Sequence, residues 1–153
     1  MSDDAWQYTL DMPHQLRAPR IARRTVRMIL AEHGLHELID TAELLTSELV
    51  TNAVRYSDGP ASVRVLWARG RLRISVCDTN PKLPVLDAAQ VAGDDEDCGR
   101  GLALVQLCAD AWDGYAIGEE LFGIGGKLIW FEMVGPASRS TVRLTATADR
   151  SGR

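Results

Sequence analysis

The sequence predicts a two-layer α/β sandwich of the α+β type, in which helices cover one face of a mixed, mostly antiparallel sheet. The first observation is the order of the periodic segments: strand, two helices, hairpin, loop, helix and strands. A parallel sheet would require a strict alternation of strands and helices. The second is that 153 residues, 46% of them hydrophobic, suffice for one core. We therefore expect a single domain over residues 1–135 and a polar tail over 136–153.

Residues 6–10 form the first expected strand, and a helix follows over 19–33. Pro19 lies in the first turn of this helix and Gly34 just past its end, the usual arrangement of these two residue types. At 100° per residue, the apolar face holds Ile21, Ala22, Thr25, Met28 and Ile29, and the opposite face holds Arg20, Arg23, Arg24 and Arg27. The arginine face is either a solvated surface or a docking surface for an acidic partner.

The second expected helix spans residues 36–56 and ends at the Ser-Asp-Gly-Pro run of 57–60. Two segments with strand character, 61–67 and 72–78, then form a hairpin around the Arg-Gly-Arg turn at 69–71.

The second half of the chain contains a long connection over residues 79–98, which we expect to be a lid or a mobile loop. A short helix is expected over 102–109, a further segment around 112–115 and a strong strand over 127–133. In the tail, 141–147 either adds an edge strand or remains irregular.

The composition excludes several classes of function. The net charge of -4 gives no overall positive field for nucleic-acid phosphates. No apolar run is long enough for a membrane span, and no basic-then-apolar leader indicates a signal peptide. The three cysteines, Cys77, Cys98 and Cys108, lack Cys-x-x-Cys spacing, so we expect reduced thiols in a cytoplasmic protein without a structural zinc.

The second helix carries two polar residues where its core-facing stripe should be apolar. Glu48 and Asn52 are one turn apart and lie at the edge of, or inside, the stripe formed by Leu45 and its apolar neighbours. Buried polar groups require partners, which either the protein or a ligand supplies. An amide oxygen can ligate magnesium and a carboxylate can accept a proton from an attacking hydroxyl, so a magnesium–nucleotide site is the functional alternative.

Asp78 ends the strand over 72–78, where it follows Leu72, Ile74 and Val76 on one face. A carboxylate thus occupies the next position in an inward-facing apolar row. Two interpretations remain open at this point. Asp78 either caps the turn that follows or accepts a hydrogen bond from a ligand amine such as that of adenine.

The segment Gly99-Arg100-Gly101 directly precedes a predicted helix that begins at Leu102. Glycines allow close backbone approach, and a helix N-terminus offers N–H groups to phosphates. Gly-x-Gly alone also marks an ordinary tight turn. There is no Walker A sequence, so a P-loop enzyme is not indicated.

Together, the run Glu-Leu-Val-Thr-Asn-Ala-Val-Arg at 48–55, Asp78, and Gly-Arg-Gly-Leu at 99–102 resemble the N, G1 and G2 boxes of the GHKL ATPase superfamily. The stretch over 125–132 is similar to the last strand of its short members, the RsbW-like anti-sigma-factor serine kinases. The resemblance covers residues 12–133. The chain departs from the pattern after Asp78, where Thr79, Asn80 and Pro81 replace the usual glycines, and at Leu128, where many relatives have threonine.

The resemblance implies a Bergerat ATP-binding fold with ATP and Mg²⁺ held under a mobile lid. Asn52 would ligate the metal, Glu48 would act as general base and Asp78 would bind the adenine amine. The phosphates would be held by Gly99, Arg100, Gly101 and Leu102.

The resemblance also implies a serine/threonine kinase that phosphorylates an anti-anti-sigma (STAS-type) protein and alternately binds a sigma factor, within a homodimer. The alternative is a module that binds ATP only to shape an interaction surface and has no significant kinase activity. Neither function requires direct contact with nucleic acid or a membrane.

Overall fold

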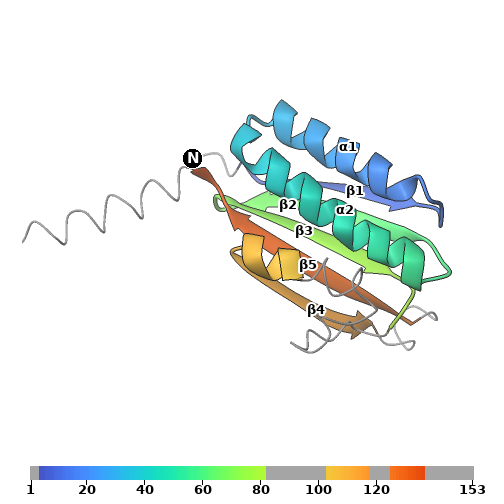
Figure 1. Cartoon of the computed structure of the whole chain (residues 1–153). Helices are drawn as coiled ribbons and strands as arrows, with labels where there is room; N and C mark the ends of the chain where they lie inside the picture. The colour runs from blue at the N-terminus through green and yellow to red at the C-terminus, as the bar shows by residue number, and fades with distance from the viewer. Residues whose placement is uncertain (1–3, 82–102, 118–124, 137–153) are drawn as a thin grey trace, which may run out of the picture.

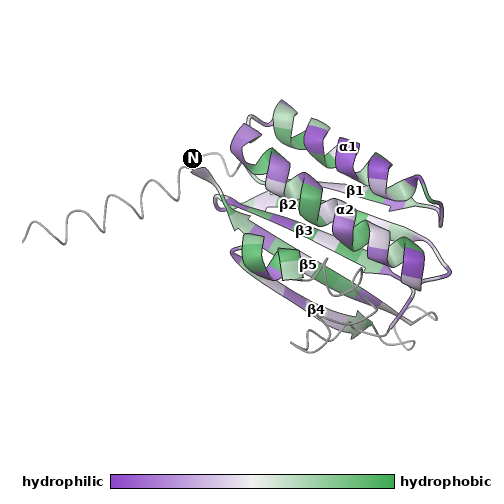
Figure 2. Cartoon of the chain, in the orientation of Figure 1, coloured by the Kyte–Doolittle hydropathy of each residue, from purple (hydrophilic) through white to green (hydrophobic). Residues whose placement is uncertain are grey.

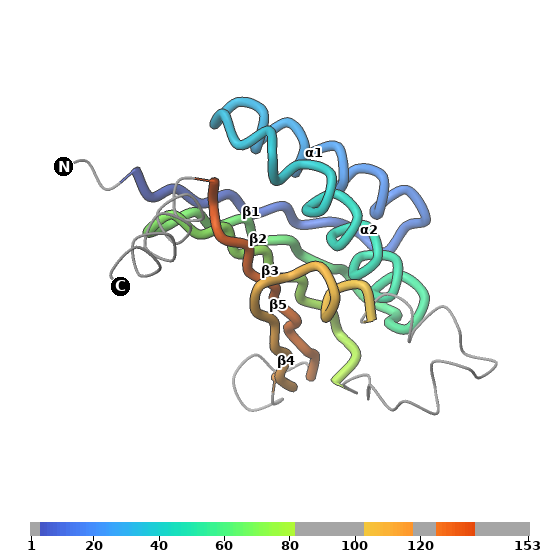
Figure 3. Tube along the Cα trace, turned by 60° about the vertical axis from the view of Figure 1, so that its left-hand side comes forward, coloured from blue at the N-terminus to red at the C-terminus, as the bar shows by residue number. Residues whose placement is uncertain are grey.

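The computed structural model describes residues 4–81, 103–117 and 125–136, which form two layers. One layer is a five-stranded sheet with the strand order β1-β2-β3-β5-β4. The helices α1 and α2 lie side by side over one face of this sheet (Figures 1 and 3). The expected sandwich is therefore confirmed, and each of the four strand pairings within the described residues is antiparallel.

The helices and strands agree closely with the predicted segments. In chain order they are β1 (Trp6–Met12), α1 (Ala18–Glu32), the 3-10 helix η1 (His36–Leu38), α2 (Ile39–Tyr56), β2 (Ala61–Ala68), β3 (Arg71–Asp78), β4 (Ala111–Ile117) and β5 (Gly126–Val134). The predicted second helix thus begins with a turn of 3-10 helix. The segment predicted around 112–115 is a full strand, β4, at one edge of the sheet. Residues 82–98 of the loop predicted over 79–98, and residues 137–153 of the predicted tail, lie outside the described residues.

The apolar face predicted for α1 is partly wrong. Ala22 and Ile29 are buried as expected, but Ile21 and Met28 are 48% and 59% exposed. The buried residues of α1 are Ala18, Ala22, Val26, Ile29 and Leu30. α1 packs against α2 as well as covering β1 and β2. Its buried residues are therefore turned toward α2, away from the face that was predicted.

The core lies between α2 and the helix-facing side of the sheet, where alternate strand residues point inward. β3 contributes Leu72, Ile74 and Val76, and β5 contributes Ile129, Phe131 and Met133. The helix supplies Ala42, Leu45, Leu49 and Ala53, all 3% exposed or less. Hydrophilic bands alternate with hydrophobic ones along both helices, as expected for helices with one solvated side (Figure 2). None of the described helices combines the length and apolar character needed to span a bilayer.

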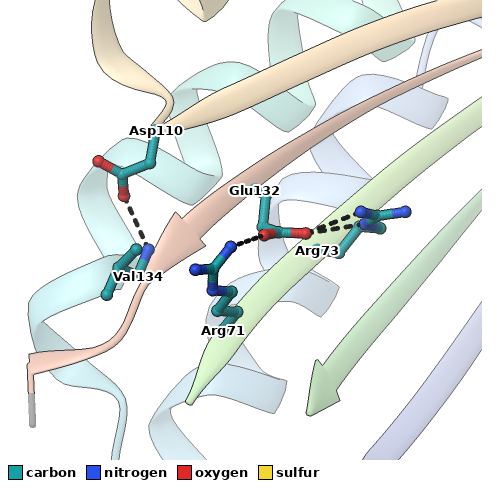
Figure 4. A network of polar contacts seen from close by, with 5 residues as sticks. All are labelled: Arg71, Arg73, Asp110, Glu132 and Val134. Carbon is teal, nitrogen blue, oxygen red and sulfur yellow. Dashed lines mark hydrogen bonds and ion pairs between the residues drawn. The ribbon is translucent and has the colours of Figure 1, made fainter. Parts of the chain in front are cut away.

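On the opposite face of the sheet, Glu132 of β5 joins two arginines of β3. Its carboxylate accepts hydrogen bonds from Arg71 at 3.0 Å and from Arg73 at 2.9 and 3.0 Å (Figure 4). Arg73 also stacks over Trp130, with its guanidinium carbon 4.0 Å from the ring centroid. Burial opposes ionisation of Glu132, but the hydrogen bonds and charges of the two arginines outweigh it and lower its pKa.

The described residues 103–108 form a short helix on the same side of the sheet as α2 (Figures 1 and 3). Its Val105 is fully buried in the main core. After this helix, the Asp110 carboxylate accepts a 2.7 Å hydrogen bond from the backbone N–H of Val134 (Figure 4). The short helix is thereby fixed to the end of β5.

Candidate functional site

The helix α2 places Glu48 and Asn52 one turn apart, in a stretch that is otherwise packed on the sheet. Asn52 is 7% exposed and lies between buried neighbours, whereas Glu48 is half-buried. Within the described part of the chain, neither side chain has a hydrogen-bond or ion-pair partner. The expected inward position of Asn52 is therefore present, and its amide remains available to a ligand.

The C-terminal end of α2 is tied to the end of β3. Asn80 donates from its side-chain amide to the backbone oxygen of Tyr56 at 2.8 Å. Gly59 lies so close to Thr79 that a Cβ on the glycine would be 2.7 Å from the threonine side chain. These contacts bring the end of the helix that carries Asn52 to the strand end that carries Asp78.

Asp78 occupies the buried end of β3, as its place in the apolar row predicts. It is 7% exposed, and its Oδ1 accepts a 2.8 Å hydrogen bond from the backbone N–H of Asn80. This is the turn-capping role that was one of the two sequence interpretations. A carboxylate has about four acceptor positions, so capping the turn does not exclude a second partner.

The second partner of Asp78 is Lys127, the second residue of β5. The ammonium Nζ lies 3.0 Å from Oδ1 and 2.8 Å from Oδ2, and the two side chains are only 4% and 6% exposed. Asp78 and Lys127 are directly opposite in the antiparallel pairing of β3 and β5. A Cβ on Gly126 would collide with the backbone oxygen of Asp78, so glycine is required for the strands to approach this closely.

Sequence reasoning did not identify Lys127 as a site residue, although a signal for it exists. Counting back in steps of two from the inward residues Phe131 and Ile129 of β5 reaches Lys127. Leu128, at which the sequence departs from the family pattern, lies opposite Cys77 on the other face of the sheet. The side chain that faces Asp78 from β5 is therefore a lysine.

The two cysteines within the described residues, Cys77 and Cys108, are both free thiols. Burial raises the pKa of Cys77, the charge of neighbouring Asp78 raises it further, and Lys127 acts in the opposite direction. Cys77 is therefore held as a neutral thiol, which is poorly nucleophilic.

Of the predicted site residues, the structure describes Glu48 and Asn52 on α2 and Asp78 at the end of β3. Asp78, Lys127 and Asn80 form one contiguous polar cluster beside the end of α2. No hydrogen bond or ion pair joins Glu48 or Asn52 to Asp78 within the described residues. Gly99, Arg100, Gly101 and Leu102 lie outside the described residues.

The residues that are present fit a magnesium ion bound together with a nucleotide. Mg²⁺ prefers oxygen ligands and is usually held by one or two protein groups, with water and phosphate oxygens completing its shell. Asn52, buried and without a protein partner in the described chain, would hold the metal through its amide oxygen. Among the described residues, no group of three or more His, Cys, Asp or Glu side chains gathers into a metal centre.

Comparison with known proteins assigns this fold to a family. Residues 12–120 match the family model of the histidine kinase-like ATPase domain, and the chain belongs to this family. It therefore has the ATP-binding domain of the GHKL class, as the three sequence boxes indicated. No functionally curated protein matches the chain significantly.

A solved structure has the same fold. The RsbU and RsbW domains of Rv1364c from Mycobacterium tuberculosis superpose with a TM-score of 0.61 at 22% sequence identity. The match covers 85% of this chain but only 32% of the other, so the present chain spans about a third of that structure. At this identity the likeness defines an RsbW-like fold.

Proposed function

We propose that the chain is an ATP-binding regulator that phosphorylates a serine or threonine of an anti-anti-sigma, STAS-type partner in the cytoplasm. In the same partner-switching circuit it binds a sigma factor, and it acts as a homodimer. The observation that carries this proposal is the pair of buried Asn52 and half-buried Glu48 on α2, neither of which has a polar partner among the described residues of this GHKL-class domain.

Each site residue has a defined role in this proposal. Asn52 holds Mg²⁺, which supplies charge neutralisation on the phosphates when bound. Glu48 accepts the proton of the attacking hydroxyl, because a carboxylate one turn from the metal ligand can reach the same reaction centre. Asp78 binds the base, and residues 99–102 bind the phosphates through backbone N–H groups.

The first experiment is isothermal titration of the protein with ATP in the presence of Mg²⁺ and then of EDTA. We expect binding that weakens at least tenfold when the metal is removed, and Asn52→Ala should abolish this metal dependence. Absence of heat at high protein concentration in both conditions would reject the nucleotide-binding role.

The second experiment measures phosphate transfer from Mg-ATP to candidate anti-anti-sigma proteins. Glu48→Gln should retain ATP binding and lose transfer by a factor of about 10² or more, the usual contribution of a general base. Glu43→Gln is the matched control, because Glu43 lies on the same helix but pairs with Arg27 at 3.1 Å, away from the proposed centre. Transfer that survives Glu48→Gln at the wild-type rate removes the proposed role of Glu48.

A binding module without kinase activity is the second candidate, and one observation favours it. Thr79, Asn80 and Pro81 follow Asp78 in place of the glycines of the family pattern, a departure expected where catalysis is lost and binding is kept. ATP binding with normal metal dependence, but no transfer to any anti-anti-sigma protein, would identify this second function.

A further inference from the structure

The ammonium of Lys127 lies in front of the Asp78 carboxylate. Its distances to the two oxygens, 3.0 and 2.8 Å, are nearly equal, so Nζ lies close to the plane that bisects the carboxylate. A ligand amine that binds a carboxylate head-on would need the same position. Lys127 therefore occupies the head-on approach to Asp78, so a base amine can reach the carboxylate only from the side.

The hydrogen-bonding groups of this cluster can be counted. Oδ1 of Asp78 accepts from the Asn80 N–H and from Lys127, and Oδ2 accepts from Lys127. One acceptor position therefore remains on Oδ2. The third ammonium contact, to the backbone oxygen of Asn80, is long at 3.4 Å. An N–H of the ammonium can thus turn to a ligand, and the cluster offers a donor and an acceptor side by side.

We propose that Lys127 is a base-selecting residue that makes the pocket accept 6-oxopurine nucleotides about as well as ATP. This inference rests on the proposed function, in which Asp78 binds the base. A carboxylate alone is acceptor-only, so it favours the 6-amino group of adenine and repels a 6-oxo oxygen. With the ammonium beside it, the same site donates to a 6-oxo group and accepts from the ring N1–H of hypoxanthine or guanine.

The adenine edge also fits, because its amine can use the free position on Oδ2 while the ammonium donates to N1. Lys127 thus reduces the difference in affinity between the two classes of base and does not exclude ATP. A purely structural role for the ion pair would stabilise the junction of β3 and β5 without changing the ratio of the two affinities.

The test compares ATP with inosine triphosphate (ITP), whose base has a 6-oxo group in place of the amine. Dissociation constants are measured by titration calorimetry with excess Mg²⁺. For the wild-type protein we expect the two values to agree within about threefold, since each base makes a charge-assisted contact. A wild-type preference for ATP of tenfold or more overturns the proposal without any variant.

Two variants test the role of the ammonium. Lys127→Thr leaves the Asp78 carboxylate as the only ionic group, so the 6-oxo group of ITP loses its charged donor. The preference for ATP over ITP should then rise to about tenfold or more, the usual contribution of one hydrogen bond to a charged group. Lys127→Arg keeps the positive donor and should retain the wild-type ratio. Circular dichroism and thermal melts establish that both variants are folded, and the wild-type ratio remains decisive where one is not.

The possible failures can be distinguished. If the wild-type protein binds neither nucleotide, the proposed function and the role of Lys127 fall together. If it binds ATP in a metal-dependent manner but Lys127→Thr leaves the ratio of ATP to ITP affinity unchanged, only the base-selecting role is rejected. Equal weakening of both nucleotides in Lys127→Thr also rejects that role, because it is the result expected of a merely structural pair.

Discussion

Lys127→Met should strongly destabilise the fold, because it removes one partner of a buried ion pair and leaves the other uncompensated. The two side chains are 6% and 4% exposed, so the Asp78 carboxylate would lose its counter-ion at a place where little water can replace it. Breaking a buried pair in this way costs about 3–5 kcal/mol. For a domain of this size, that corresponds to a fall in Tm of roughly 6–20 °C.

Urea unfolding of a double-mutant cycle measures the interaction directly. The second single variant is Asp78→Asn, which keeps an oxygen for the Asn80 N–H but leaves the ammonium without its counter-ion. The double variant removes both charges and should lose about 2 kcal/mol less than the sum of the two singles. Arg71→Met is the control, because Arg71 is 61% exposed and its ion pair with Glu132 should contribute less than about 1 kcal/mol.

Two results would refute this reasoning. The first is a Lys127→Met protein whose stability lies within about 0.5 kcal/mol of wild type, the range of ordinary surface substitutions. The second is strict additivity in the cycle, which would mean that the two charges do not interact in the folded protein.

Three further perturbations test other parts of the fold. Thr46→Val should raise the free energy of unfolding in urea by about 1 kcal/mol, because the Thr46 hydroxyl is fully buried and has no hydrogen-bond partner among the described residues. A loss of stability would show that the hydroxyl is bonded. The lowered pKa of Glu132 means that its stabilising contribution is complete above its ordinary pKa of about 4.5 and is lost as the pH falls through the lower folded value. Between pH 6 and 3, the free energy of unfolding should therefore fall less in Glu132→Gln than in wild type. Identical pH profiles would contradict a stabilising role of the ionised Glu132. Gly126→Ala should lower Tm, because its Cβ would meet the backbone oxygen of Asp78, and an unchanged Tm would show that the strands can separate without cost.

Most helices and strands were predictable because their apolar residues recur with the helical or the strand period. The positions of Asn52 in the stripe of α2 and of Asp78 in the row of β3 required only the helical and strand repeats, and both side chains are buried as predicted. The apolar face of α1 was harder to predict, because packing on α2 turned the buried stripe away from Ile21 and Met28, and such a partner leaves no trace in the helix's own sequence.

The pairing of Asp78 with Lys127 depends on information that lies outside either local segment. The two residues are opposite each other only because β3 and β5 are neighbours in a particular register. A shift of one residue would replace Lys127 with Leu128 or Gly126 and would move every side chain of β5 to the other face. The strand repeat places Lys127 on the inward face of β5, but which strand lies next to β5 is decided by the tertiary fold.

The adjacency of β3 and β5 has a consequence for how this domain can diversify. The chain leaves β3 after Asp78 and enters β5 at Gly126, and these two points touch, although the edge strand β4 lies between them in the sequence. A change of chain length between Pro81 and the short helix of 103–108 therefore need not alter the register that sets Lys127 against Asp78, because the pairing of β3 with β5 does not depend on that length. If Lys127 selects the base as proposed, the choice of base would be determined by the two paired strands, whereas the length of the chain before 103 could vary without changing it.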